Sequence, residues 1–194
     1  MLVEIITLMN LNEIPIHKNS PIVVNAIVEI PKGERAKYEY NKTYEVFQLD
    51  RCLTSAMAYP ANYGFIPKTL GEDNDPLDII IYNDISIAMG SLVECKIVGM
   101  LDMVDGGEND HKIIGVPLYH SRINEYNSYE DLDGLFLKIT ENFFEHYKDL
   151  NEKEVKINGW RGPIEAKEVI DRSIVGNCSY KAYKAPVNVG DLEL

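Results

Sequence analysis

Short segments of alternating apolar and polar residues, bounded by Pro, Gly, Asn or Asp, run through the first two thirds of this chain. Such a period of two is typical of half-buried strands. It predicts strands at residues 23–30, 36–40, 44–51, 77–82, 91–104 and 112–117, with a turn at 105–107. Several short, sequential strands of this kind indicate a small closed or nearly closed barrel.

The alternation also predicts which side chains share a face. In residues 23–30 the apolar face consists of Val24, Ala26, Val28 and Ile30. Glu29 takes the opposite face of that strand. Lys37 and Glu39 have the same parity, as do Asp110 and Lys112, so we expect each pair to point into one cavity where the backbone is extended.

The last third of the chain changes to a helical period. One predicted stripe consists of Leu132, Leu135, Phe136, Ile139, Phe143, Tyr147 and Leu150. Tyr147 should therefore face the protein. A second helix is expected to begin at Pro163 behind Gly162. Its buried residues should be Ala166, Val169, Ile170 and Ile174. The pattern thus predicts an α+β, mainly β fold with two main helices.

Composition narrows the class of protein. With 194 residues, of which 45% are hydrophobic, we expect a single domain over residues 1–194, with residues 1–20 and 172–194 as peripheral segments. A net charge of −12 disfavours nucleic acid and anionic membrane surfaces as partners. An odd number of cysteines, without a Cys-x-x-Cys pair, and no apolar run of membrane-spanning length favour a cytoplasmic protein.

Residues 73–78, DNDPLD, crowd three carboxylates into six positions directly before an apolar strand. Asp105, Asp110 and Lys112 follow about one hairpin later. Oxygen-only clusters suit hard cations, above all Mg²⁺, which keeps several waters and binds phosphate oxygens. The working hypothesis is metal-assisted chemistry on phosphate.

The hexapeptide also has two other interpretations. Asp-Asn-Asp before Pro also fits an ordinary solvated turn, because Asp and Asn bond their own backbone. A calcium-binding EF-hand loop fits poorly, because Asp78 stands where that loop requires Gly and Asp84 where it requires Glu.

Several blocks in order resemble the family I soluble inorganic pyrophosphatases, and the resemblance covers roughly residues 29–170. The blocks are VEIP at 28–31, KYE at 37–39, DR at 50–51, YPANYG at 59–64, DNDPLD at 73–78, the segment 105–112, and FFEHYKD at 143–149. The resemblance implies an OB-like five-stranded barrel flanked by helices. It also implies hydrolysis of pyrophosphate to two phosphates with Mg²⁺, about three to four ions per site when substrate is bound.

The same resemblance assigns roles to residues. It implies that the metal ligands are Glu29, Asp73, Asp78, Asp105 and Asp110. It implies that the substrate phosphates are bound by Lys37, Arg51, Tyr63, Lys112, Tyr147 and Lys148. Asp75 matches the carboxylate near the attacking water and would act as general base. Phosphoryl transfer depends mainly on positioning and electrostatic stabilisation, so a site built from these groups makes chemical sense.

Two rival classes remain. A noncatalytic acidic metal-binding module would need the carboxylates but not the ordered Lys, Arg and Tyr residues. A Mg²⁺-dependent phosphoesterase acting on another phosphoanhydride, such as a nucleotide, should add an element that stacks on a base, and none is evident in the sequence. The compact length resembles the prokaryotic branch of the family, which implies a homo-oligomer, with a hexamer favoured. His146 is expected at a packing or subunit contact, and Trp160 beneath the final helix.

Overall fold

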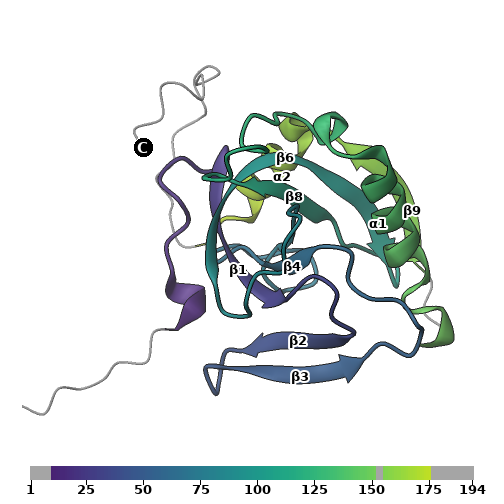
Figure 1. The fold of residues 1–194 in the computed structure, drawn as a ribbon. Helices are drawn as coiled ribbons and strands as arrows, with labels where there is room; N and C mark the ends of the chain where they lie inside the picture. Colours follow the sequence, from purple (N-terminus) through teal and green to yellow (C-terminus); the bar gives the residue numbers. More distant parts are fainter. Residues whose placement is uncertain (1–9, 152–154, 176–194) are drawn as a thin grey trace, which may run out of the picture.

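The computed structural model describes residues 10–151 and 155–175. Five strands close into a ring: β1 (Val23–Ile30), β4 (Asn62–Phe65), β5 (Asp78–Ile81), β8 (Lys112–Pro117) and β6 (Leu92–Asp105). Neighbours are antiparallel except β5 and β8, and the pairing of β1 with β6 closes the ring. The predicted five-stranded barrel is therefore confirmed (Figure 1).

Four further strands extend or accompany the barrel. The second half of β6 pairs with β9 (Val155–Arg161) and with β7 (Glu108–Asn109). A hairpin of β2 (Ala36–Asn41) and β3 (Val46–Cys52) forms a separate two-stranded sheet beside the barrel (Figure 1). The sequence pattern missed β4, β7 and β9. The short β4 lies in a segment that is buried throughout, so no alternation marks it.

The two predicted helices are present. Helix α1 (Gly134–His146) lies against β9, and its N-cap Asp133 accepts hydrogen bonds from the backbone N–H groups of Leu135 and Phe136. Helix α2 (Pro163–Ser173) begins with Pro163 and packs on β6. Single 3-10 turns occur at η1 (Leu11–Glu13), η2 (Tyr129–Asp131) and η3 (Asp149–Asn151). No helix within the described residues combines the length and the apolar character needed to cross a membrane.

The predicted apolar stripe of the first helix is partly wrong. Leu135 and Ile139 are 66% and 49% exposed, and Leu150 lies outside α1 at 70% exposed. Leu132, Phe143 and Tyr147 of the predicted stripe are buried as expected, and Thr140 and Phe144 complete the buried face. The reason is that the helix ends at His146, so the face that meets the barrel is set by its last two turns. The prediction for Tyr147 is confirmed.

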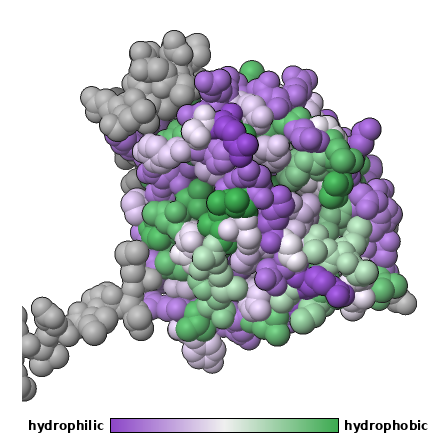
Figure 2. Space-filling model, viewed as in Figure 1, coloured by the Kyte–Doolittle hydropathy of each residue, from purple (hydrophilic) through white to green (hydrophobic). Residues whose placement is uncertain are grey.

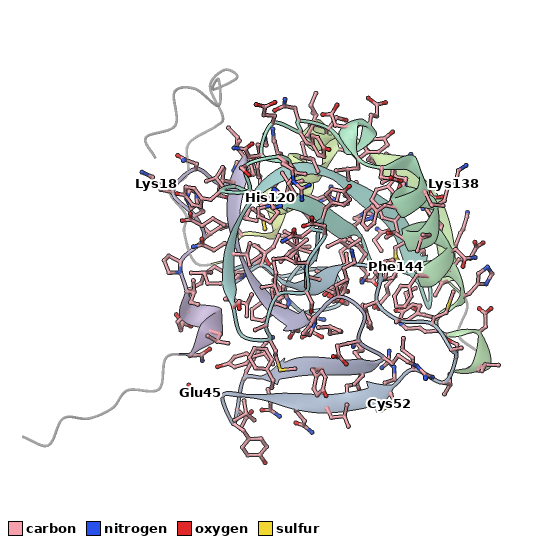
Figure 3. The ribbon with its side chains drawn as sticks, viewed as in Figure 1. Lys18, Glu45, Cys52, His120, Lys138 and Phe144 are labelled. Carbon is pink, nitrogen blue, oxygen red and sulfur yellow. The ribbon has the colours of Figure 1, made fainter. Side chains whose placement is uncertain are left out.

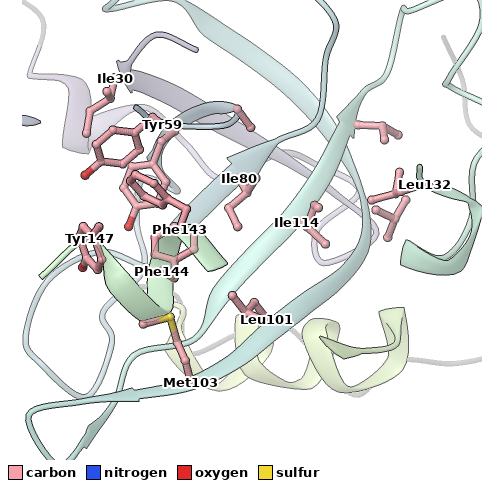
Figure 4. Packing of buried hydrophobic residues seen from close by; sticks show 14 of the residues in the cluster. Ile30, Tyr59, Ile80, Leu101, Met103, Ile114, Leu132, Phe143, Phe144 and Tyr147 are labelled. Carbon is pink, nitrogen blue, oxygen red and sulfur yellow. The ribbon is translucent and has the colours of Figure 1, made fainter. Parts of the chain in front are cut away.

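The prediction that β1 has a single buried, apolar face is wrong. All eight of its residues are buried, because the strand has protein on both faces. Val24, Ala26 and Val28 pack with residues of α2, whereas Ile30 packs in a different cluster with Phe143. A register shift between Val28 and Ile30 against β4 accounts for the change of face. Figure 4 shows Ile30 beside Tyr59, with the rings of Phe143, Phe144 and Tyr147 further along the same cluster.

Smaller expectations also change. His146 is exposed in the single chain, so it does not pack in the core, and its Nδ1 lies 2.9 Å from Asp149 Oδ2. The subunit contact expected of it stays a prediction. Trp160 lies in β9, and its ring stacks on Tyr129 at 6.0 Å between centroids instead of lying beneath α2. Ile174 follows α2 and is only partly buried. Within the segment expected to be peripheral, Ile14 is buried against Ile27 and Phe65.

Candidate active site

A cavity of about 220 Å³ collects the predicted site residues with the exception of Arg51. Those lining it are Glu29, Lys37, Tyr63, Asp73, Asp75, Asp78, Asp105, Asp110, Lys112, Tyr147 and Lys148. They come from β1, β2, β4, β5, β6 and β8, the loops beside them, and the residues directly after α1. The barrel thus brings to one place side chains that are more than a hundred positions apart in sequence.

Arg51 does not line this cavity. It stands opposite Lys37 in the β2–β3 register, and its Nη1 lies 2.6 Å from Asp50 Oδ2. The hairpin therefore places Arg51 next to a residue of the cavity. In Figure 3 the labels Glu45 and Cys52 stand near the two ends of β3, the hairpin strand that carries Arg51, and Phe144 is labelled inside the molecule. The direct phosphate contact expected of Arg51 stays a prediction.

Lys112 lies between two carboxylates at the centre of the cavity. Its Nζ is 2.5 Å from Asp78 Oδ2 and 2.5 Å from Asp110 Oδ1. The lysine side chain is only 3% exposed and lies 5.9 Å from the ring centroids of Tyr63 and Phe144. Burial lowers the pKa of Lys112, but attraction by the two carboxylates outweighs it and holds the pKa above its usual value. The ammonium is therefore charged.

At Asp110 burial outweighs the attraction of the neighbouring ammonium in setting the pKa of the carboxyl. Burial raises its pKa above the ordinary value and the nearby Asp78 adds to this, although Lys112 acts against both. A second lysine, Lys148, forms an ion pair with Asp105, and burial is the main reason that its pKa is lowered. Asp78, Asp110 and Asp105 are thus each paired with a buried lysine of the cavity.

The rim of the cavity is more exposed. Lys37 pairs with Glu39 and lies 3.3 Å from Asp50 Oδ2. Lys42 lies 3.4 Å from Asp75, whose side chain is 75% exposed. Glu39 and Lys42 line the cavity although the resemblance gave neither of them a substrate or metal role. The general base expected at position 75 therefore stands where solvent water reaches it.

The hexapeptide 73–78 forms a turn and also faces the cavity. Asp73 Oδ1 accepts a hydrogen bond of 3.0 Å from the backbone N–H of Asp75, and Asn74 has a φ of 67°. This is the turn chemistry that the sequence allowed as an alternative. The turn directs Asp73, Asp75 and Asp78 toward one cavity, so the two interpretations do not exclude each other.

Glu29 lies deepest among the acidic groups. Burial raises its pKa to about 8, even though the backbone N–H of Tyr40 donates a hydrogen bond to it. Burial also raises the pKa of Tyr63, Tyr147 and Tyr59. These phenols therefore keep their protons and can donate hydrogen bonds to an anion. Sequence reasoning gave no role to Tyr59, although it falls within the block at 59–64 that carried the resemblance.

The donor set fits a hard cation. Carboxylate oxygens dominate, and burial makes negative charge costly at Glu29 and Asp110, so a divalent ion would be stabilised there. Over residues 10–151 and 155–175, however, no three His, Cys, Asp or Glu side chains converge closely enough to hold one ion. Lys112 occupies the point between Asp78 and Asp110.

The fold and the cavity together define an OB-like barrel enzyme whose site sets carboxylates against lysines and tyrosines. Residues 26–176 match the family model described as Inorganic pyrophosphatase, and the chain belongs to this family. An inorganic pyrophosphatase of Picrophilus torridus is 44% identical over 84% of this chain and 92% of its own length. One from Rhodospirillum rubrum is 44% identical over 89% and 99%, respectively.

Solved structures agree with the sequence relatives. The crystal structure of inorganic pyrophosphatase from Thermus thermophilus superposes with a TM-score of 0.82 at 37% identity, and covers 86% of this chain and 97% of that protein. A crystal structure of an inorganic pyrophosphatase from Neisseria gonorrhoeae gives a TM-score of 0.78 at 40% identity, over 84% of this chain and 96% of that protein. The predicted family and fold are therefore confirmed.

Proposed function

We propose that this protein hydrolyses inorganic pyrophosphate to two phosphates in a Mg²⁺-dependent reaction. The observation that carries the proposal is the cavity in which Asp78 and Asp110 meet Lys112, with Lys148, Tyr63 and Tyr147 around them. Membership of the pyrophosphatase family supports it independently.

The residues of the chain would share the work as follows. Glu29, Asp73, Asp78, Asp105 and Asp110 would hold Mg²⁺, about three to four ions with substrate present, the oxygen-rich ligand set that this ion prefers. Bound there, Mg²⁺ polarises phosphate oxygens and lowers the pKa of a bound water. Asp75 orients the attacking water and accepts its proton.

The basic and phenolic groups would act on the phosphates. Lys112, Lys148 and Lys37 neutralise negative charge on the two phosphoryl groups, and Arg51 approaches from the hairpin. Tyr63 and Tyr147 donate hydroxyl hydrogen bonds, because burial keeps them protonated. The cavity thereby binds the developing charge of the departing phosphate.

A phosphate-release assay tests this assignment directly. We expect release from pyrophosphate in the presence of Mg²⁺, none with a chelator, and recovery when Mg²⁺ is restored. ATP and a phosphomonoester should be poor substrates under the same conditions. Faster release from ATP would favour the rival phosphoesterase, and absence of turnover on all three would favour a noncatalytic metal-binding module.

We further propose that the chain is a single domain that works in the cytoplasm as a homo-oligomer, with a hexamer favoured. The large exposed side chains of Leu135 and Ile139 on α1, and of Leu49 on the hairpin, support an assembly. On the face seen in Figure 2, hydrophobic residues form separate patches among hydrophilic ones. Analytical ultracentrifugation should give a mass well above 22.0 kDa, and a monomer at all concentrations would reject the assembly.

A further inference from the structure

Lys112 holds two carboxylates at once. Its Nζ lies at 2.5 Å from one oxygen of Asp78 and one of Asp110, and the lysine is 3% exposed while the two carboxylates are 26% and 17% exposed. Such short, shielded contacts carry much of the electrostatic balance of the cavity. Without the ammonium, two carboxylates would lie together with no opposite charge between them.

The two buried lysines of the cavity, Lys112 and Lys148, are paired in the same way. Lys112 and Lys148 were both expected to bind phosphate, and each is bound to a carboxylate that was expected to bind metal. An ammonium at 2.5 Å from a carboxylate oxygen competes with Mg²⁺ for that oxygen, because two cations bound to it would stand within a few ångströms of each other and repel. The carboxylates expected to bind the cation are therefore paired with the lysines expected to bind the anion.

We propose that Lys112 is an internal counter-ion of Asp78 and Asp110, which it gives up when a divalent cation binds, so that its ammonium becomes free to bind phosphate. This rests on the proposed function for the identity of the two ligands. Cation binding and phosphate binding are then coupled through a single side chain. By linkage, phosphate must strengthen cation binding by the same factor, and such couplings are roughly 5- to 150-fold.

Lys112 would then have two separate effects, one on Mg²⁺ binding and one on phosphate binding. Lys112 competes with Mg²⁺ for the carboxylates when phosphate is absent, and it binds phosphate when Mg²⁺ is present. Removing its charge should therefore strengthen the binding of Mg²⁺ alone but weaken the binding of phosphate with Mg²⁺. A lysine that only binds phosphate would change the second quantity and not the first.

Isothermal titration of Mg²⁺ into the protein, without phosphate, tests the competition. In Lys112→Met the dissociation constant for Mg²⁺ should fall by at least about fivefold, the lower end of such couplings. Lys68→Gln is the matched control, because Lys68 pairs with Glu13 away from the cavity and its loss changes net charge equally. Equal effects in the two variants, or an unchanged or higher constant in Lys112→Met, would overturn the proposal.

Inorganic phosphate is the second probe. In the unmodified protein, saturating Mg²⁺ should tighten phosphate binding, and in Lys112→Met the ratio of the two phosphate affinities should shrink. An equal ratio in both proteins contradicts the coupling. Neither titration needs turnover, so a failure of pyrophosphate hydrolysis and a failure of the coupling are seen separately.

A measurement on the unmodified protein covers the case in which Lys112→Met does not fold. Nitrogen NMR of the lysine ammonium groups, with the Lys112 signal assigned by its loss in Lys112→Arg, reports the surroundings of Nζ. Addition of Mg²⁺ should shift this signal as Lys112 leaves Asp78 and Asp110, while the signal of Lys68 stays in place. A Lys112 signal unmoved at saturating Mg²⁺ would show that the ammonium stays with its carboxylates, and the proposal would be wrong.

Discussion

The carboxylate of Glu29 accepts a hydrogen bond of 2.7 Å from the backbone N–H of Tyr40, which joins barrel strand β1 to hairpin strand β2. The ring of Tyr40 completes this junction, because it packs on Phe65 of β4 and Phe47 of β3. The hairpin carries Lys37 and Arg51, so this junction sets how the two cations stand toward the barrel.

Glu29→Ala and Glu29→Gln separate the hydrogen bond of this residue from its charge. Gln keeps an acceptor for Tyr40, whereas Ala leaves a buried N–H unpaired, which costs about 1–3 kcal/mol. We expect Glu29→Ala to lower the free energy of unfolding by that amount and to raise KM for pyrophosphate. Urea unfolding and initial rates measure the two effects. Equal stability of the two variants would mean that the junction does not depend on this bond.

Asp75→Asn tests the general base. Its kcat for pyrophosphate should fall by roughly 10²–10⁴, the range for loss of general-base catalysis, while Mg²⁺ affinity measured by calorimetry changes little. Asp110→Asn should show the opposite order, with Mg²⁺ binding weakened first. A variant at position 75 that loses Mg²⁺ but keeps kcat at saturating metal would exchange the two roles.

Gly64→Ala tests the close approach of β4 to β1. A Cβ at position 64 would lie 1.8 Å from the carbonyl oxygen of Ile27, so the two paired strands must move apart. We expect a loss of about 1–3 kcal/mol in the free energy of unfolding, and reduced turnover because Tyr63 is the next residue. Gly134→Ala is the control, since a Cβ there would meet nothing within 4 Å beyond its chain neighbours and the backbone of its own helix, and α1 begins at this residue.

The two described cysteines should differ in reactivity, measured in a Cys178→Ser background. Cys95 is fully buried, and burial raises the pKa of its thiol, so it stays protonated well above the ordinary value of 9.0. Cys52 is exposed. Alkylation of the folded protein should label Cys52, because it is exposed, and should label Cys95 only in denaturant. Labelling of Cys95 without unfolding would contradict its burial.

Periodicity located most of the strands and both main helices. Strands β1, β2, β6 and β8 and helix α2 agree with the sequence within a residue or two, because their turns carry Gly, Pro or Asp. It failed where packing overrides the pattern. Strand β9 alternates in burial but its sequence mixes Gly159 with Trp160, and α1 turns a different face inward than its leucines indicate.

The sequence indicated most of the residues that line the cavity, but not how their side chains are arranged. Ordered blocks identified the residues that line the cavity, since family motifs preserve residue type and spacing. They could not show that Lys112 lies between Asp78 and Asp110, because that contact depends on the parallel pairing of β5 with β8. Nor could they show that Arg51 turns to Asp50, a choice of side-chain conformation within one strand.

Strand β6 pairs with β1, β7, β8 and β9, so the barrel cannot close during synthesis before β6 has been translated. A nascent chain that has left the ribosome only as far as β5 holds β1 and β4 without the strand that closes the ring. Closure must join segments about seventy positions apart, and the outer half of β6 waits further for β9. Non-local pairings of this kind are slow to form, in the range of milliseconds to seconds. The newly made protein therefore keeps its ring open until residues near Pro117 have emerged, and the outer half of β6 lacks its partner β9 until residues near Arg161 have emerged.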